Sequence, residues 1–303
     1  MTQGFFITGT DTAVGKTVVT TALLRRFRLN GLTVGAMKPV ETGVVPGMES
    51  ISDAARLRAA AEMPEGADEV NPYRFPTPLA PYDAARLAGV SIDPERMLRA
   101  FHRLTARYRP LLVEGAGGLL VPILPDWSMR DLLLALDLPV ILVGRAMLGG
   151  VNHALLTLES LSCAGCRVEA LVLTQPSPDN GPDARLQRES TVELLKTQAG
   201  VPVFGPVPYR PSLRTQWNET IEELAETTIF RSLADSSAQR SKKPTQRVLQ
   251  VRRSQGCRDH RDAVGAGGEK IRNRLQRNPP IAKIGSVVNS RACLSPLIPT
   301  SGS

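Results

Sequence analysis

The chain has 303 residues, of which 42% are hydrophobic and 22% are charged, and this length allows one large domain or two smaller ones. No apolar run approaches the roughly 18 residues that a membrane-spanning helix needs, so we expect no membrane span. The first residues do not resemble a secretory signal, because no positive segment precedes an apolar stretch and a cleavage site. Four cysteines in such a chain favour a cytoplasmic location.

The net charge of +8 is concentrated in the last part of the chain. Residues 231–303 hold 15 Lys and Arg against 4 Asp and Glu, a balance of +11, which leaves 22 against 25, or −3, for residues 1–230. A basic surface indicates a polyanionic partner when it lies on the folded part or on a recognisable arm. The basic runs here also lack the interleaved aromatic residues of a stacking platform. We therefore do not expect nucleic acid as a partner.

Up to about residue 230 the chain alternates short apolar runs with longer helical patterns, which is typical of βαβ units. In chain order the patterns predict a strand over 5–8, a helix over 16–29, a strand over 33–37, helices over 54–61 and 94–108, a strand over 111–113, a helix over 129–136, a strand over 140–143, a helix over 151–161, a strand over 168–173, a helix over 184–198, a strand over 201–207 and a helix over 218–227. Because the strands are continuously apolar, both faces of the sheet should be covered. We expect an α/β fold with a mostly parallel sheet and helices on both faces.

The composition changes near Leu233, after which Ser, Arg, Lys and Gln dominate and the apolar residues lose their period. Such a segment buries too little apolar area to offset its ordering entropy. We therefore expect one domain over 1–232 and a basic, mostly disordered segment over 233–303. In the alternatives, stretches such as 248–251 or 281–288 add a strand or dock on the domain, or the segment has no selected role.

Residues 9–17, with the sequence GTDTAVGKT, follow the first predicted strand and open the first predicted helix. This context favours a phosphate-binding loop, in which backbone N–H groups and the helix N-terminus hold phosphate oxygens. Lys16 would reach the β- and γ-phosphates, and the Thr17 hydroxyl would ligate Mg²⁺. Five residues, not four, separate Gly9 from Gly15. The pattern nevertheless predicts a nucleotide site of the P-loop NTPase type.

Asp11 lies near the start of this loop, where ATPases of the chromosome-partitioning and septum-positioning type carry a second lysine. The difference argues against a partitioning ATPase. A carboxylate pointing inward would repel phosphate, so we expect Asp11 to face a cation or a substrate amine.

Charged residues also follow two other predicted strands. Glu114 ends the strand over 111–113, and Lys38 ends the strand over 33–37. Ligands of open parallel sheets gather at the carboxyl ends of strands, so both side chains should lie near the phosphate loop. Glu114 can hold Mg²⁺, or turn N–H groups can satisfy its carboxylate. Lys38 can stabilise a transferring phosphoryl group, or remain solvated at the strand end.

Asp53 stands where the helix over 54–61 should begin. Aspartate is a preferred N-cap residue, and its carboxylate is also a suitable Mg²⁺ ligand. The spacing alone leaves capping and metal ligation equally open.

Four segments together resemble the dethiobiotin synthetase family: GTDTAVGKT at 9–17, KPVETG at 38–43, EGAGG at 114–118 and LGGVNH at 148–153. Their order and separations also match, and the likeness covers roughly residues 1–209. The loop alone would be shared with relatives such as the cobyrinic acid amidoligases, whereas KPVETG together with LGGVNH is specific to this family.

The resemblance implies an ATP-dependent cyclo-ligase of biotin biosynthesis. Its substrates would be 7,8-diaminononanoate, CO₂ and ATP, with Mg²⁺ as cofactor, and its product dethiobiotin would form through a carbamate and a carbamic–phosphoric anhydride. The family also implies a homodimer. Two alternatives stay open: a nucleotide-dependent switch ATPase of the partitioning type, and a relative of the cobyrinic-type amidoligases.

The resemblance further assigns roles to residues. Lys38 and Lys16 would be catalytic, and Thr17, Asp53 and Glu114 would ligate the metal. The implied ATP-binding residues are Ala13, Val14, Gly15, Lys16, Thr17, Val18, Asp53, Glu114, Gly115, Ala116, Gly117, Thr174, Gln175, Pro206, Val207 and Pro208. The implied substrate-binding residues are Thr12, Thr42, Gly149, Gly150, Val151 and Asn152. Many members read adenine with an Asn-Asp pair where this chain has Thr174 and Gln175, so adenine selectivity is either relaxed or carried by the backbone at 206–208.

Overall fold

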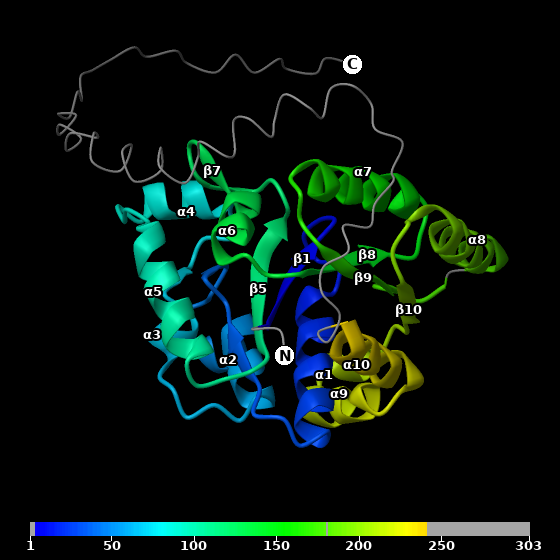
Figure 1. Cartoon of the computed structure of the whole chain (residues 1–303), viewed down its shortest axis with the longest axis horizontal. Coiled ribbons are helices and arrows are strands. Elements are labelled where there is room, and N and C mark those ends of the chain that lie inside the picture. The colour runs from blue at the N-terminus through cyan, green and yellow to red at the C-terminus, as the bar shows by residue number, and fades with distance from the viewer. Residues whose placement is uncertain (1–3, 180, 241–303) are drawn as a thin grey trace, which may run out of the picture. The chain divides into compact units, whose positions relative to one another are not determined.

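Six parallel strands form the central sheet of the structure, a computed structural model that describes residues 4–179 and 181–240 (Figure 1). In space they lie in the order β10 (Val203–Val207), β9 (Val168–Thr174), β8 (Val140–Arg145), β1 (Gly4–Gly9), β5 (Leu111–Gly118) and β2 (Gly35–Met37). Each of these strands contains or falls within one of the six predicted strands. The predicted α/β fold with a parallel sheet is therefore confirmed.

Strand β1 occupies the middle of this sheet, between β5 and β8, and all six of its residues are buried. The chain leaves β1 toward the β5 and β2 side and later returns to build β8, β9 and β10 on the other side. This change of direction opens a crevice at the carboxyl end of β1, where parallel sheets bind their ligands.

Helices cover both faces of the sheet, as predicted. The seven helices predicted from periodicity are present as α1 (Lys16–Leu29), α2 (Asp53–Ala60), α5 (Pro94–Thr105), α6 (Met129–Leu136), α7 (Gly150–Cys163), α8 (Pro182–Gln198) and α9 (Trp217–Ala225). Figure 1 shows α1 and α9 together on one side of the sheet and α7 and α8 on the other. Because α1 begins directly after the β1 loop, its N-terminus faces the crevice.

Several short elements escaped the sequence analysis because they span too few residues to show a period. They are β3 (Val40–Thr42) paired with β4 (Tyr73–Phe75), the hairpin of β6 (Pro122–Leu124) and β7 (Trp127–Ser128), helices α3 (Ala67–Val70) and α4 (Pro81–Leu87), and the 3₁₀ turns at Glu49–Ile51 and Pro211–Arg214. Strand β3 matters most for the site, since it continues directly from Lys38 and carries Glu41 and Thr42.

The domain boundary expected at residue 232 falls inside a helix, α10 (Thr228–Arg240). Phe230, Leu233 and Ala234 on this helix are buried, and the helix packs against α1 and β10. The composition changes within the helix, while an apolar stripe at helical spacing still runs through these residues. The domain therefore continues past the predicted boundary. Residues 241–303, with the candidate stretches 248–251 and 281–288, lie outside the described residues.

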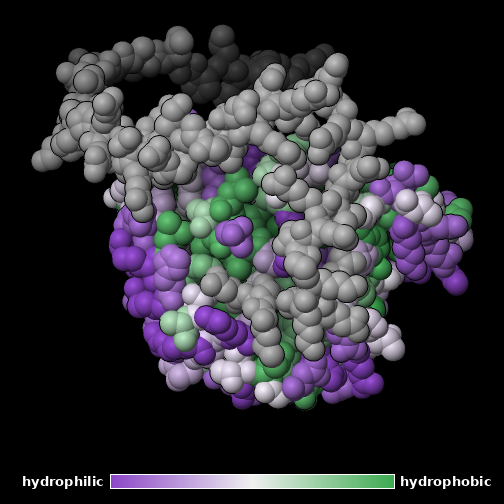
Figure 2. All heavy atoms as spheres, in the orientation of Figure 1, coloured by the Kyte–Doolittle hydropathy of each residue, from purple (hydrophilic) through white to green (hydrophobic). Residues whose placement is uncertain are grey.

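The surface near α3 and α5 is hydrophilic (Figure 2). Its arginines form ion pairs with carboxylates of the same surface. Arg99 contacts Asp93 at 3.1 Å, and Arg107 contacts Glu69 at 2.6 Å. These arginines are neutralised by carboxylates of the same surface, which fits the slightly acidic balance of residues 1–230. In the part of the chain that the structure describes, no helix is long and apolar enough to cross a bilayer.

We predict that Leu233→Ala lowers the free energy of unfolding by about 2–5 kcal/mol, because Leu233 is fully buried and its loss leaves a cavity between α10 and the domain. Urea denaturation measures the change. Leu87→Ala on α4, where the leucine is 59% exposed, is the matched control and should cost less than about 0.5 kcal/mol. Equal effects of the two substitutions would show that α10 does not belong to the folded domain.

Candidate active site

The loop between β1 and α1 has the backbone that phosphate binding requires. Ala13 and Gly15 adopt positive φ angles of 54° and 89°, and no described side chain caps the first turn of α1. A Cβ on Gly9 would lie 2.8 Å from the Asp11 carbonyl oxygen and 3.0 Å from Lys16 Nζ, so only glycine fits there. The first N–H groups of α1 therefore remain available to an anion.

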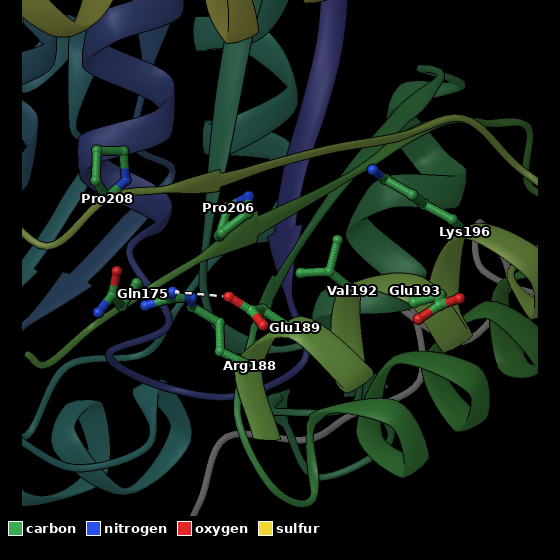
Figure 3. Close-up of a pocket in the computed structure, with 8 residues that line it drawn as sticks. All are labelled: Gln175, Arg188, Glu189, Val192, Glu193, Lys196, Pro206 and Pro208. Carbon is green, nitrogen blue, oxygen red and sulfur yellow. Dashed lines mark ion pairs between the residues drawn. The ribbon is translucent and has the colours of Figure 1, made fainter. Parts of the chain in front are cut away.

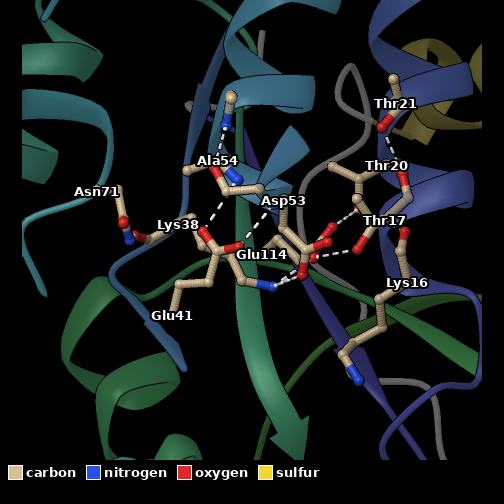
Figure 4. A network of polar contacts seen from close by, with 12 residues as sticks. Lys16, Thr17, Thr20, Thr21, Lys38, Glu41, Asp53, Ala54, Asn71 and Glu114 are labelled. Atoms are coloured by element: carbon tan, nitrogen blue, oxygen red, sulfur yellow. Dashed lines mark hydrogen bonds and ion pairs between the residues drawn. The ribbon is translucent and has the colours of Figure 1, made fainter. Parts of the chain in front are cut away.

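Lys16 lies across this loop and is 7% exposed. Its ammonium donates to the Asp11 carbonyl oxygen at 2.9 Å and points away from Glu114 (Figure 4). Burial, followed by repulsion from the Lys38 ammonium, lowers the pKa of Lys16 to about 8. Lys16, which is predicted to reach the phosphates, thus lies at the loop and is largely buried.

Lys38 is the centre of a buried polar network that joins the carboxyl end of β2 to the middle of β5 (Figure 4). Its Nζ donates to Glu114 Oε1 at 2.6 Å and to Asp53 Oδ2 at 2.9 Å. The Lys38 side chain is 4% exposed and that of Glu114 is fully buried, whereas the Asp53 side chain is 35% exposed. The interpretation of Lys38 as a solvated strand-end lysine is therefore wrong.

Glu114 is tied to α1 as well as to Lys38. Thr17 Oγ1 donates to Glu114 Oε1 at 3.0 Å, and Thr20 Oγ1 donates to Oε2 at 2.6 Å. Thr20 was missed by the sequence analysis, although it follows Lys16 and Thr17 by one helical turn and so shares their face. Glu114 lies within β5, which continues to Gly118. Two hydroxyls and the Lys38 ammonium therefore bind its carboxylate, and the alternative of turn N–H groups is wrong.

Asp53 does not cap α2, so capping, one of the two roles left open by its spacing, is excluded. The N-cap is Ser52, whose Oγ accepts from Ala55 N at 3.2 Å. Glu41 of β3 accepts the next free donors, Asp53 N at 2.6 Å and Ala54 N at 3.1 Å. With the helix start satisfied by these two residues, the Asp53 carboxylate is free to face Lys38. Glu41 was present in KPVETG without an assigned role.

The charged groups of the network shift one another's pKa values. Burial alone would lower the pKa of Lys38, but Glu114 and Asp53 together raise it above its ordinary value, so Lys38 is a cation. Burial likewise opposes ionisation of Asp53, yet the Lys38 charge and the hydrogen bond from Lys38 lower its pKa overall. The site therefore holds a fixed ammonium and an ionised, accessible carboxylate.

Several predicted residues lie around this network. Gly115, Ala116 and Gly117 form the last part of β5, and Gly117 has φ of 65°. A Cβ on Gly117 would lie 3.5 Å from Thr12 Oγ1, so the structure brings this glycine to the phosphate loop. Thr42 ends β3 and Val18 is partly buried in the first turn of α1.

The residues expected to bind the base divide into two groups. Thr174 is 5% exposed, and its hydroxyl donates to the Val14 carbonyl at 2.7 Å, so its side chain supports the phosphate loop. Gln175, Pro206 and Pro208 instead line a cavity of about 490 Å³, opposite Arg188, Glu189, Val192, Glu193 and Lys196 of α8 (Figure 3). Val207 is buried in β10 and does not line the cavity.

The residues at Gly149–Asn152 lie apart from the lysine network. Gly149 is the N-cap of α7 with φ of 83°, and Gly150 is buried. Gly149, Val151 and Asn152 line a groove of about 640 Å³ between α7 and α8, together with Leu148 and Leu155. The structure therefore places these residues at a helix start, as predicted, on a surface that α8 completes.

Comparison with known proteins places the chain in a family. Residues 3–216 match the family model described as an AAA domain. An ATP-dependent dethiobiotin synthetase BioD of Thermodesulfovibrio yellowstonii is 40% identical over 238 residues, which cover 76% of this chain and 95% of the relative. The chain belongs to the dethiobiotin synthetase family. A protein of the same name from an Anaeromyxobacter species is 47% identical over 64% of this chain and 89% of the relative. Another from Bacillus licheniformis is 33% identical over 78% of this chain and 100% of the relative. The resemblance drawn from the four motifs is thus confirmed.

We predict that the affinity for a nucleoside triphosphate falls as the pH rises above about 8, by up to about tenfold per pH unit. The reason is the lowered pKa of Lys16: its amine loses the proton above about pH 8 and must regain it to bind phosphate oxygens. Calorimetric titrations between about pH 7.5 and about 9.5 measure the effect. In Lys16→Arg the guanidinium stays charged, so the remaining affinity should not depend on pH. A flat wild-type profile would contradict the prediction.

Proposed function

We propose that the chain converts 7,8-diaminononanoate, CO₂ and ATP into dethiobiotin, ADP and phosphate. Membership of the dethiobiotin synthetase family supports this activity. The structural observation that carries it is the Lys38 ammonium, which follows β2 and is held between Asp53 and Glu114 of β5, the strand next to β1 and its phosphate loop. A second, fixed cation beside a phosphate loop is suited to an anionic intermediate.

The proposed reaction proceeds in three bond-forming steps. An amine of the substrate attacks CO₂ and loses a proton, giving a carbamate. A carbamate oxygen then attacks the γ-phosphorus of ATP, ADP leaves, and a carbamic–phosphoric anhydride forms. Finally the neighbouring amine attacks the carbonyl carbon, phosphate leaves, and the ureido ring closes with loss of a proton. Each step places negative charge on oxygens that the two lysines can stabilise.

Lys38 and Lys16 take different parts in this proposal. Lys38 is fixed by two carboxylates, so it offers its charge to the carbamate and to the transferring phosphoryl group without having to reorganise. Lys16 holds the β- and γ-phosphates from within the loop. Thr12 and Thr42 would contact the diamine or its carbamate, because Thr12 lies beside Gly117 and Thr42 ends β3, which begins two residues after Lys38.

The donors at the site fit Mg²⁺. Thr17, Asp53 and Glu114 offer hard oxygen atoms, and Asp53 is the more accessible of the two carboxylates. No group of three or more His, Cys, Asp or Glu among the described residues is arranged to bind a metal ion without help. This fits Mg²⁺, which commonly uses one or two carboxylates together with water and substrate phosphates. When bound, Mg²⁺ would neutralise charge on the phosphate oxygens.

The cavity at Gln175, Pro206 and Pro208 is our candidate for the adenine site. Its prolines provide an apolar wall and Gln175 a hydrogen-bonding amide, while Thr174 is engaged with the loop. We also propose a cytoplasmic homodimer in which the groove at the start of α7 holds the distal carboxylate of the substrate. Exposed leucines beside that groove, including Leu148 at 75% and Leu186 at 66%, support burial by a second copy.

Incubation with the diamine, bicarbonate and MgATP, followed by mass spectrometry, tests the activity directly. The ring-closed product and phosphate release that depends on both diamine and bicarbonate are expected. Release stimulated instead by DNA or a membrane would favour a switch ATPase and contradict the proposal.

We predict that Lys38→Met lowers kcat by more than about a hundredfold, because the fixed cation beside the transferred group is lost. The same substitution should lower the melting temperature, since it leaves the buried Glu114 carboxylate without its ion-pair partner. The double variant with Glu114→Gln removes that unpaired charge, so it should recover stability without recovering turnover. Near-normal kcat in either variant would refute the catalytic role of Lys38.

A further inference from the structure

A guanidinium outside the predicted motifs reaches the phosphate loop. Arg145 is the last residue of β8, and its Nη2 donates to the Thr12 carbonyl oxygen at 2.6 Å. The same atom lies 3.5 Å from Asp11 Oδ2. The sequence predicts that Asp11 faces a cation or a substrate amine, and the structure brings Arg145 to that carboxylate.

The backbone of Arg145 is fixed by the sheet. Arg145 pairs with Thr174 of β9, and the next residue, Ala146, donates its N–H to the Thr174 carbonyl at 2.8 Å. The start of α7 also packs closely here, since a Cβ on Gly150 would lie 2.1 Å from the Arg145 carbonyl oxygen. The side chain therefore extends from a rigid position, and the Thr12 carbonyl holds its far end.

Side-chain contacts hold the first half of the loop. Lys16 Nζ donates to the Asp11 carbonyl oxygen, Thr12 N donates to Asp11 Oδ1 at 2.7 Å, and Arg145 binds the Thr12 carbonyl. The Asp11 carboxylate has a side chain 52% exposed at the mouth of a loop that receives a polyanion. An uncompensated carboxylate at such a position would weaken phosphate binding by repulsion.

We propose that Arg145 is a positioning residue for the triphosphate, which acts by neutralising Asp11 and by holding the Thr12 carbonyl in the loop. This inference rests on the proposed role of the loop as the ATP site. The side chain of Arg145 contacts Thr12 and Asp11, so we expect its substitution to change ATP binding by altering the phosphate loop.

Four proteins test the proposal as a charge series: wild type, Arg145→Met, Asp11→Asn and the double variant. Calorimetry measures the Kd for MgATP at low salt. Arg145→Met leaves one added negative charge beside the loop and should weaken binding roughly tenfold. Asp11→Asn keeps an acceptor for Thr12 N but leaves the arginine charge unopposed, so it should tighten binding roughly threefold. The double variant restores the balance and should return to within about threefold of wild type.

Ionic strength provides a second readout. In about 0.5 M salt the four Kd values should converge to within about threefold, because exposed charges are screened. The KM for the diamine should change by less than about twofold in Asp11→Asn, since the carboxylate serves Arg145. A packing defect would not be relieved by removal of the Asp11 charge and would not depend on salt.

An unchanged Kd in Arg145→Met would overturn the proposal, and so would a loss that Asp11→Asn does not relieve. A tenfold rise of the diamine KM in Asp11→Asn would also overturn it and make Asp11 an amine site. Arg99→Met on α5, an exposed arginine with an acidic partner, is the matched control and should bind ATP as wild type does. If Arg145→Met does not fold, Arg145→Lys replaces it, and a Kd beyond about threefold of wild type would then contradict charge neutralisation. Failure of the wild-type protein to bind MgATP would instead defeat the proposed function itself.

Discussion

The arrangement of the site depends on one buried ion pair, between the Lys38 ammonium and the Glu114 carboxylate. Taking either charge out of water alone would be prohibitively unfavourable, so each is stable inside the domain only while the other is present. Their pairing joins the end of β2 to the middle of β5, and the Thr17 and Thr20 hydroxyls extend the same network to α1. Three elements that are distant in sequence are thereby held around one group of charges.

Asp53 differs from Glu114 in what it leaves open. Glu114 is surrounded by a lysine and two hydroxyls, whereas Asp53 retains access to solvent. Glu41 and Ser52 make this possible, because they accept the N–H groups at the start of α2 that an aspartate there would otherwise satisfy. Because Glu41 accepts these N–H groups, the Asp53 carboxylate remains available to a ligand.

Much of this arrangement could be predicted from the sequence. The six apolar runs identified every strand of the main sheet, and the phosphate loop and Lys38 were placed at the crevice because parallel strands end on one edge. Asp53 remained ambiguous, since its competitor for capping, Ser52, is adjacent and Glu41 approaches from another strand. Arg145 and Thr20 carry no motif, so their roles emerge only when tertiary contacts are known. The boundary near Leu233 was missed because composition changes before the helical stripe ends.

Helix α1 links the two ends of the domain. Its N-terminus forms the phosphate loop, while its other residues pack against α9 and α10. A ligand that binds this N-terminus stabilises the packed state of the helix, and by thermodynamic reciprocity the docking of α10 favours the ligand. We therefore expect a bound nucleotide to make α10 more resistant to proteolytic cleavage.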